Sequence, residues 1–587
     1  MSELLQVAKA LSRSSDEDLV RVIGIRLMPS ASFNDFFDFA AALVKPQNVT
    51  GAIAGLTRNQ IIAFNNLLTN SSTKADAPSL EILTTLFLVE KTVASGKTKY
   101  TPLESAQTVF KQLVSKKVID SLTNQTLKES ESSFDNSDLI DSQAGIGAFE
   151  TVQALTELVI ELEQRYVREV GRGAVGLPEL KRLASHLGRN VEYARSLYAL
   201  AQMSSLIFLN EKRWRVGSHY LTWLQSSPEE RWLHLAKTWR SLLGEASSNE
   251  LADATNLKKA IAETYPLANE GITSHMLRLV QLADLIGLTS SDEMSSWFQP
   301  LMRGDLTKAA EQLGKNLPKT QNRIIVQADL TVISVGPLPT DKELELRRFV
   351  ETERIGVAST YRISPLSITY GLETGLTEKK IRDLLQELSA QVLPQPVDYL
   401  IREAANRFRR LVLKDDAGTT LIESTDQVLL MQILNDSNLR TISMQRKDEN
   451  TLQSRFELDI VYYQLRDSKY AAIRMDSKGK VVSHWIAAGS NEALAVRPPS
   501  VLNDIARWRE HDKRLGDAPL GDDIVRQLEM AIKNKATIDV TVQTKEALRE
   551  FTLEPTGLAN GRLRAKDRKA DCERVLPLMS ITSVRIG

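Results

Sequence analysis

The spacing of the apolar residues changes along this chain, and that change constrains the fold more than any other feature. Up to about residue 320, apolar side chains recur at three- and four-residue intervals, as in Leu4, Ala8 and Leu11, which is the spacing of one helix face. A β-rich run, NRIIVQADLTVISVGPL, then breaks the pattern, and further short β-rich segments close the chain. The 587 residues also exceed the roughly 250–300 that one hydrophobic core serves. We therefore expect a mostly helical α+β protein of about three to five domains.

Candidate domain boundaries lie where the composition shifts. Residues 129–142 (ESESSFDNSDLIDS) are polar and acidic, and Pro498 with Pro499 interrupts the chain later. We see no repeat with a fixed period. The expected division is a helical N-terminal domain (1–128), a linker (129–146), a winged-helix domain (147–245), a helical segment (246–320), an α/β module (321–418), a small α/β domain (419–497), a linker (498–520) and a small, barrel-like β domain (521–587).

Composition excludes some broad classes. The chain carries 74 basic and 74 acidic side chains, so any attraction to nucleic acid must come from a local patch. Its one cysteine, Cys572, excludes an internal disulfide and a multi-cysteine metal site. The N-terminus does not have the pattern of a signal peptide, and no run of about 18 apolar residues occurs. We expect a cytoplasmic protein without membrane contact and leave association with the nucleoid open.

The segment GLPELKRLASHLG predicts a short helix, with Pro178 in its first turn and Gly188 at its end. A second helix, NVEYARSLYALAQMSSL, and a small hairpin follow, which is the order of a winged helix-turn-helix. Between Gly171 and Leu221, eight Lys or Arg stand against three Glu. A nucleic-acid contact would use Arg182, Arg189, Asn190 and Arg195 near the helices and Lys212, Arg213 and Arg215 in the wing. The alternative is a winged helix used for protein contacts, and the sequence does not distinguish DNA from RNA.

Two further basic clusters occur. One holds Arg402, Arg407, Arg409, Arg410 and Lys414, and the other holds Arg562, Arg564, Lys566, Arg568 and Lys569. Each cluster could contact phosphates, although such a cluster is more often an ordinary exposed face. The tryptophans of the helical stretches lie among apolar residues, which favours core packing over base stacking.

Catalytic chemistry is not indicated. The one Gly-Lys-Thr, at residues 96–98, lacks the glycine that a phosphate-binding loop needs five residues earlier, because Lys91 stands there. We interpret that segment as an ordinary helix end. The six histidines show no metal-ligand spacing, and Asp329, inside a β-rich run, is expected to end a strand, cap a turn or pair with an arginine. We therefore expect no catalytic residue, no cofactor and no metal.

The segment from Arg323 to about Lys414 resembles the N-terminal domain of XPB-type helicases. The resemblance lies in RIIVQADLTVISVG, YRISPLSITYGLETGLTEKKIRDLLQELS and LPQPVDYLIREAANRF. In those helicases this domain is not the motor. The resemblance therefore implies an XPB N-terminal-like domain over 321–418 that docks a protein or contacts DNA.

The whole chain is similar to actinobacterial proteins described as helicase-associated, and its end, from Ile524 to Ile586, resembles a WYL-type domain. The second resemblance lies in Leu553-Glu554-Pro555, Gly561-Arg562-Leu563, Asp567 and Arg574. The Trp-Tyr-Leu signature itself is absent, since the equivalent strand is TIDVTV, and Ser580 replaces an expected basic residue. The fold is what this resemblance implies, rather than ligand sensing.

These observations predict a non-enzymatic, helicase-associated accessory factor. It would dock a partner such as an XPB-like helicase through protein–protein interaction, and hold DNA without sequence preference in DNA repair or transcription. The alternative is a DNA-binding transcriptional regulator in which the WYL-like domain acts on the winged helix.

Overall fold

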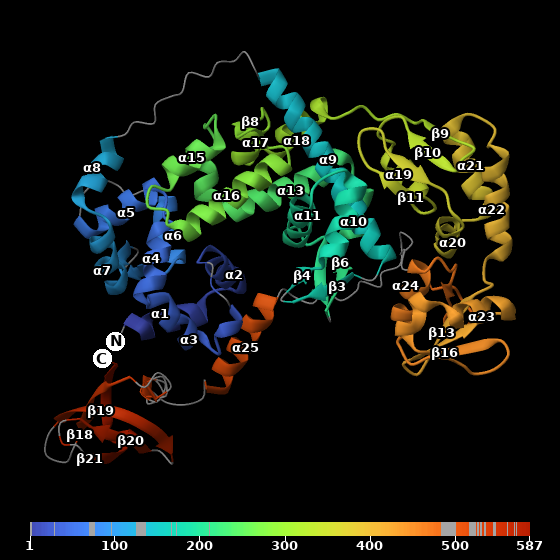
Figure 1. Ribbon diagram of the computed structural model, residues 1–587. Helices are drawn as coiled ribbons and strands as arrows, with labels where there is room; N and C mark the ends of the chain where they lie inside the picture. The colour runs from blue at the N-terminus through green and yellow to red at the C-terminus, as the bar shows by residue number, and fades with distance from the viewer. Residues whose placement is uncertain are drawn as a thin grey trace. The chain divides into compact units, whose positions relative to one another are not determined.

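The chain folds into two compact units, residues 1–125 with 498–587 (unit 1) and residues 126–497 (unit 2). A computed structural model describes residues 3–26, 28, 30–69, 77–94, 97–124, 137–165, 167–171, 173–210, 212–482, 500–515, 524, 527–528, 531–532, 536–543, 548–559, 562–568, 570 and 572–586 (Figure 1). The protein is mostly helical with several small sheets, as the changing apolar spacing predicts. None of the described helices combines the length and apolar character that a membrane span requires.

Unit 1 is not purely helical at its N-terminal end. Its helices are α1 (Glu3–Arg13), α2 (Asp16–Ile25), α3 (Phe36–Val44), α4 (Pro46–Ala54), α5 (Arg58–Thr69), α6 (Ala77–Thr85), α7 (Glu104–Leu113) and α8 (Lys116–Asn124). Between α6 and α7 the strands β1 (Val89–Ala94) and β2 (Lys97–Pro102) form an antiparallel hairpin, with Val89 opposite Pro102. The interpretation of Gly-Lys-Thr as a helix end was therefore wrong. Alternating β-branched residues such as Thr92 and Val93 favour a strand here.

The linker predicted over 498–520 was also wrong, because helix α25 (Ser500–Leu515) lies there. Asp504, Ile505 and Trp508 recur at helical spacing and are buried. The Trp508 indole N–H donates to the Phe33 carbonyl at 2.9 Å, and its ring lies 5.4 Å from that of Phe39. A segment from near the end of the chain thus completes the core of the N-terminal helices.

The C-terminal part of unit 1 is a five-stranded antiparallel sheet. Its order is β21-β20-β19-β18-β22. The strands are β18 (Ile538–Gln543), β19 (Leu548–Ala559), β20 (Arg562–Asp567), β21 (Cys572–Pro577) and β22 (Ile581–Ile586). The predicted β-rich end of the chain is confirmed, but within the described residues β21 and β22 form open edges rather than a closed barrel. The sequence also predicts a helix over Asp522–Asn534, and most of that segment lies outside the described residues.

Unit 2 is built around the long helix α9 (Ser137–Gln164), which is buried along most of its length. The helix begins inside the predicted linker 129–146, with Asp138 in its first turn, where an acidic side chain suits the helix dipole. Around it lie β3 (Val167–Val170), β4 (Ala174–Val175), α10 (Leu177–Leu187), α11 (Val191–Met203), β5 (Ile207–Asn210), β6 (Arg213–Val216), α12 (Tyr220–Gln225), α13 (Pro228–Leu243), α14 (Glu245–Leu251), α15 (Leu257–Thr264), α16 (Glu270–Leu285), β7 (Thr289–Ser290), β8 (Glu293–Met294), α17 (Phe298–Met302) and α18 (Leu306–Asn316).

These elements share one hydrophobic core. Trp232, Trp239 and Trp297 are fully buried, and each indole N–H donates to a backbone carbonyl. The acceptor is Ile286 for Trp232 at 2.7 Å, Leu279 for Trp239 at 2.8 Å and Gly287 for Trp297 at 2.8 Å. The prediction that these tryptophans serve the core is confirmed.

The segment that resembles XPB-type helicases has a sheet and a core of its own. Its elements are β9 (Ile324–Val326), β10 (Thr331–Ser334), α19 (Thr340–Arg347), β11 (Glu351–Arg354), β12 (Thr360–Arg362), α20 (Pro365–Glu373), α21 (Glu378–Ser389) and α22 (Gln395–Arg407). The predicted turn is confirmed at Asp329, whose carboxylate accepts the Thr331 N–H at 3.1 Å.

A small α/β module follows in unit 2. It comprises β13 (Val412–Asp416), β14 (Thr419–Glu423), α23 (Gln427–Asn435), β15 (Met444–Arg446), β16 (Thr451–Ser454), α24 (Leu458–Asp467) and β17 (Ile473–Arg474), with sheet order β15-β16-β14-β13-β17. Its first strand begins before the predicted boundary at 418/419, so the division between the two modules lies earlier than expected.

Three segments of the protein share one local design of two helices, a tight turn and a β-hairpin. We name them the first module (α5, α6, β1, β2), the second module (α10, α11, β5, β6) and the third module (α15, α16, β7, β8). A residue with positive φ follows the second helix of each, namely Phe87, Ser205 and Gly287. The next residue is a fully buried leucine in every module, namely Leu88, Leu206 and Leu288.

The backbone bonds of these leucines are equivalent. Each N–H donates to the carbonyl five residues earlier, at 3.0, 2.9 and 2.8 Å, which is the bond of a Schellman turn. Each carbonyl accepts the N–H of the residue that follows the hairpin, at 3.0, 2.7 and 3.1 Å, from Leu103, Gly217 and Ser295. The modules lie at unequal intervals with little shared sequence, so a search for a fixed period does not find them.

Candidate nucleic-acid interface

The second module has the helix, helix and hairpin that the sequence predicts. Gly188 ends α10 with φ of 60°, and the Asn190 side chain caps α11 by accepting the Tyr193 N–H at 2.8 Å. The hairpin β5–β6 joins β3 and β4 in one antiparallel sheet. Asn190 therefore holds a structural position at the start of the second helix, where we had expected it to contact nucleic acid.

The predicted arginines on the helices all meet carboxylates of their own chain. Arg182 pairs with Glu161 at 3.2 Å and with Glu179 at 2.5 Å. Arg189 pairs with Glu150, and Arg195 pairs with Glu192 at 3.4 Å on the exposed face of α11. The charges of these three arginines are therefore compensated locally, and the uncompensated positive charge of α10 is that of the exposed Lys181, which forms no ion pair with the described residues.

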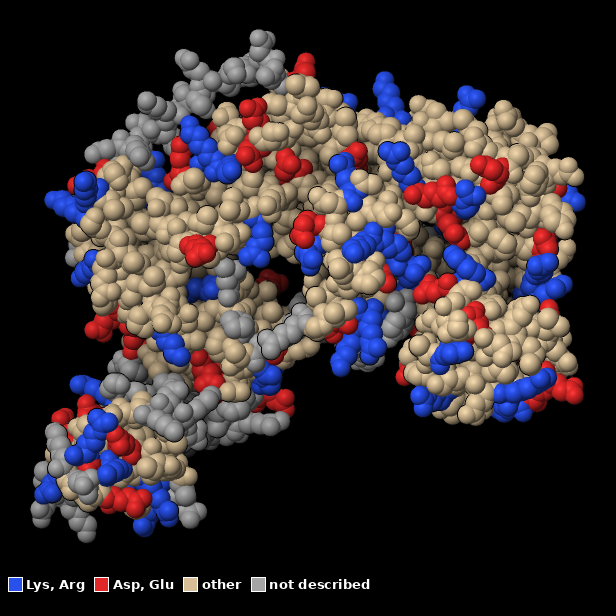
Figure 2. Space-filling model, viewed as in Figure 1, with Lys and Arg blue, Asp and Glu red and all other residues tan. Residues whose placement is uncertain are grey.

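The three predicted wing residues have different environments. Lys212 is exposed at the hairpin turn, and Arg215 is half-buried. Arg213 is only 6% exposed, pairs with Asp459 of α24 at 2.9 Å, and its guanidinium lies 4.9 Å from the Tyr463 ring. Arg213 therefore anchors the wing to the small α/β module. Figure 2 shows Lys and Arg side chains over the end of the sheet that holds β3 and β6.

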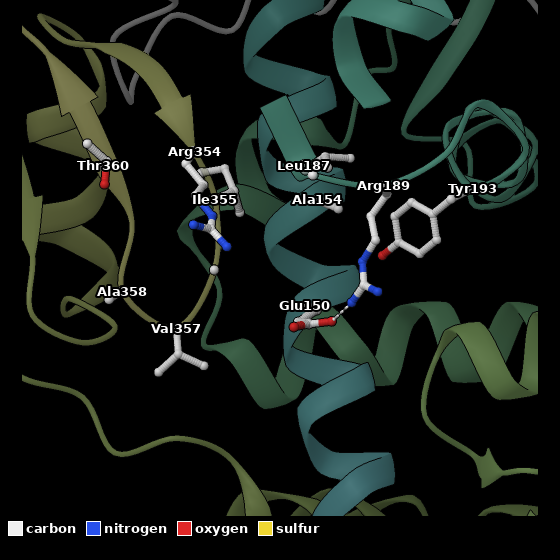
Figure 3. A pocket seen from close by; sticks show the side chains of 12 residues that line it. Glu150, Ala154, Leu187, Arg189, Tyr193, Arg354, Ile355, Val357, Ala358 and Thr360 are labelled. Carbon is white, nitrogen blue, oxygen red and sulfur yellow. Dashed lines mark hydrogen bonds and ion pairs between the residues drawn. The ribbon is translucent and has the colours of Figure 1, made fainter. Parts of the chain in front are cut away.

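A pocket of about 570 Å³ lies where α9, the start of α11 and the β11–β12 hairpin meet (Figure 3). Arg189 and Arg354 line it from different elements, together with Glu150 and Tyr193. The guanidinium of Arg189 bonds Glu150 and lies 5.6 Å from the Tyr193 ring. The Glu150 carboxylate opposes entry of an anion, so this polar pocket is a weak candidate for phosphate binding.

Sequence reasoning missed a buried charge cluster on α9. Glu157 pairs with Arg347 of α19 and accepts the Thr352 hydroxyl at 2.9 Å, and the Arg347 and Glu157 side chains are 1% and 4% exposed. Glu161, one turn along, bonds His186 of α10 at 2.8 Å. The cluster therefore joins α9 to α10 and to the segment that resembles XPB-type helicases. Acidic residues at helical spacing within an apolar helix were the available sequence signal.

The cluster suits ion pairing better than a metal. Burial raises the pKa of Glu157, and the nearby Arg347 works against this. Burial also acts to raise the pKa of Glu161, but the hydrogen bond from His186 and the charge of Arg182 outweigh it and lower that pKa. Glu157, Glu161 and His186 offer ligand atoms within 4.8 Å of one another. A metal ion would have to displace two guanidinium groups, so these residues do not fit one.

Two other predicted clusters are exposed. At the end of α22, Arg407 pairs with Glu403, while Arg409 and Arg410 form no ion pair with the residues that the structure describes. On β20 of unit 1, Arg562 and Arg564 point outward and alternate with the buried Leu563 and Ala565.

The arginines of β20 have no acidic neighbour across the strands. Arg564 lies between Gly557 of β19 and Val575 of β21, and Arg562 lies between Ala559 and Pro577. Because uncharged residues stand on both sides, this end of β20 is the clearest positive surface among the predicted sites.

Comparisons with known proteins bear on unit 2. Residues 324–448 match the family model described as helicase conserved C-terminal domain. Over 141 residues the chain is 30% identical to the DNA 3'-5' helicase XPB of Mycobacterium tuberculosis, which covers 23% of this chain and 25% of that helicase. The chain thus spans about a quarter of the length of the curated relative it matches.

These similarities make the chain helicase-related. The matching family model is described as a C-terminal helicase domain, whereas we expected from the sequence an N-terminal domain of XPB-type helicases. The match includes β13 of the small α/β module and continues past residue 418 through β14, α23 and β15.

Proposed function

We propose that this protein is a non-enzymatic, helicase-associated accessory factor. Its helicase-related region would dock a motor subunit, such as an XPB-like helicase, and its exposed basic residues would hold DNA without sequence preference. The observation that carries the proposal is that the helicase-related segment has a sheet and a hydrophobic core of its own. A self-contained module of this kind suits a docking surface.

The position of the one Gly-Lys-Thr supports a non-motor role. Lys97 and Thr98 begin strand β2 of a hairpin, with Ala94 opposite Lys97 and Val93 opposite Thr98. A phosphate-binding loop instead joins a strand to the N-terminus of a helix, where backbone N–H groups surround the phosphates. Among the described residues, Lys97 and Thr98 lie in a strand and not at the N-terminus of a helix.

DNA contact is proposed for the exposed arginines. Arg562 and Arg564 on β20, and Arg409 and Arg410 after α22, have guanidinium groups without ion pairs among the described residues. Guanidinium groups bind phosphate oxygens in two-bond geometry. Because phosphates are alike at every base pair, such contacts give affinity without sequence preference.

Three measurements test the proposal. The purified chain should show no ATP hydrolysis above a buffer control, with or without duplex DNA, and steady turnover would overturn the non-enzymatic role. It should bind unrelated duplexes with equal affinity, and binding should weaken steeply with salt. It should also form a complex with a purified XPB-type helicase, and that complex should be lost when surface residues of α21 and α22 are charge-reversed.

A second candidate is a DNA-binding transcriptional regulator. The five-stranded sheet of the C-terminal β domain favours this candidate, because a regulator needs a unit that acts on its DNA-binding part. A regulator should protect one preferred operator in footprinting. An accessory factor should protect no preferred site.

A further inference from the structure

The hairpins of the three modules differ in length and charge although their backbone bonds are equivalent. The strands are six residues long in β1 and β2, four in β5 and β6, and two in β7 and β8. At roughly 3.3 Å per residue, the strands of the first hairpin are about three times as long as those of the third. The modules thus offer three wings of different reach.

The third wing is unsuited to a phosphate. Its turn holds Ser291 and Asp292 with positive φ, and Glu293 follows directly. Asp292 is half-buried, and Glu293 is exposed. A short hairpin with two negative charges repels a polyanion.

The second wing is fixed to its neighbours. Arg213 and Arg474 converge on Asp459 at 2.9 Å each, and the Tyr463 hydroxyl donates to the Glu163 carbonyl at 3.2 Å. This wing can offer Lys212 at its tip, but the face that carries Arg213 is closed by α24.

Among the described residues, the first wing bonds α6 through one cross-strand pair, Lys91 and Tyr100. Lys91 of β1 bonds Glu81 of α6 at 2.6 Å, and the Tyr100 hydroxyl of β2 donates to the same carboxylate at 3.1 Å. Beyond this point, Thr92, Val93 and Lys99 are exposed, with Val93 at 68%. The hairpin is thus anchored on α6 and open along its outer half.

The chemistry of the open half fits a phosphate backbone. Strand β2 has lysines at positions 97 and 99 of the sequence; Lys99 is exposed, and Thr98 beside it offers an exposed hydroxyl donor, while the Thr92 hydroxyl donates to the Lys99 carbonyl at 3.4 Å. Among the described residues, Lys99 forms no ion pair. The hairpin carries no Asn, Gln or Arg, which are the usual readers of base edges. Glu81 on α6 also disfavours insertion of that helix into a groove.

We infer that the β1–β2 hairpin is a DNA-contacting wing that binds the phosphodiester backbone of duplex DNA without reading its sequence. The inference rests on the proposed function and extends it to a segment whose strands the sequence analysis did not foresee. The first module would then present a working wing, while the second module uses its wing mainly for contacts inside unit 2.

The test compares salt-dependent DNA binding of full-length variants. The variant Lys97→Ala/Lys99→Ala should bind a 20-base-pair duplex about tenfold more weakly at 50 mM salt, and the slope of log K against log[salt] should fall by roughly 2. Its melting temperature should be unchanged. The matched control, Lys308→Ala/Lys315→Ala on α18, removes the same charge from exposed positions elsewhere and should bind as the parent does.

The outcomes separate the two proposals. If the parent chain binds no duplex, DNA contact fails as a function. If the parent binds and the wing variant binds equally well, with its salt slope unchanged, this inference is wrong while the proposed function stands. Equal weakening of the wing variant and the α18 control would show a general charge effect and would also overturn the inference.

Discussion

The first and second modules have the same turn and the same leucine backbone bonds, but the hairpin of the second packs against its own chain while the outer half of the first hairpin is exposed. In the second module, Arg213 is buried against Asp459, a residue 246 positions away. In the first module, the contact of the hairpin with α6 is local, since Lys91 and Glu81 lie ten residues apart. The comparison teaches that the exposure of a wing depends on what the distant chain places against it, and not on the local motif.

The buried cluster beside the second module gives the largest expected effect. Arg347→Met leaves Glu157 buried without its cation, and such a loss costs about 3–5 kcal/mol. The loss of unfolding free energy can be measured by urea denaturation followed by tryptophan fluorescence, because most tryptophans lie in unit 2. The analogous change at the first module, Lys91→Met, removes an exposed pair and should leave the midpoint unchanged. Equal behaviour of the two variants would contradict the contrast between them.

The second expected effect is a pH dependence of folding stability that comes from Glu163. Burial raises the pKa of Glu163, at the end of α9, to about 7. Because the folded-state pKa lies above the unfolded value, the chain loses stability as pH rises from about 4.5 to 7, by up to about 3 kcal/mol. Glu163→Gln should therefore be more stable than the parent at pH 8 and equally stable at pH 4. A stability difference that does not change with pH would show that folding does not raise the pKa of Glu163.

A smaller effect is expected at the closed wing. Arg213→Ala removes the bond to Asp459 and should cost about 1.5–3 kcal/mol. Affinity for duplex DNA should stay within twofold of the parent value, measured by fluorescence anisotropy at a temperature where both chains are folded. Loss of affinity without loss of stability would mean that the second wing contacts DNA directly.

Local features were predictable from the sequence. Pro178, Gly188 and Asn190 mark helix ends through their own backbone preferences, and the alternating C-terminal segments form the expected strands. The apolar neighbours of Trp232 and Trp239 likewise predict burial.

Features that depend on distant partners were not predictable. Arg347 and Glu157 are 190 residues apart, and Trp508 meets Phe33 across 475 residues. The basic residues around 171–221 favoured the second module as the DNA site, because a count of charges does not show which carboxylates fold against them. The first wing was missed for the opposite reason, since its few lysines form no conspicuous cluster.

Chemical footprinting of the unaltered chain tests the contrast between the wings most directly. Lysine acylation and arginine-directed dicarbonyl modification would be measured by mass spectrometry with and without duplex DNA. We expect Lys99 to react in the free chain and to be protected by DNA, and Arg213 to stay unreactive in both states. Reactivity of Arg213 that DNA suppresses, with Lys99 unaffected by DNA, would contradict the account.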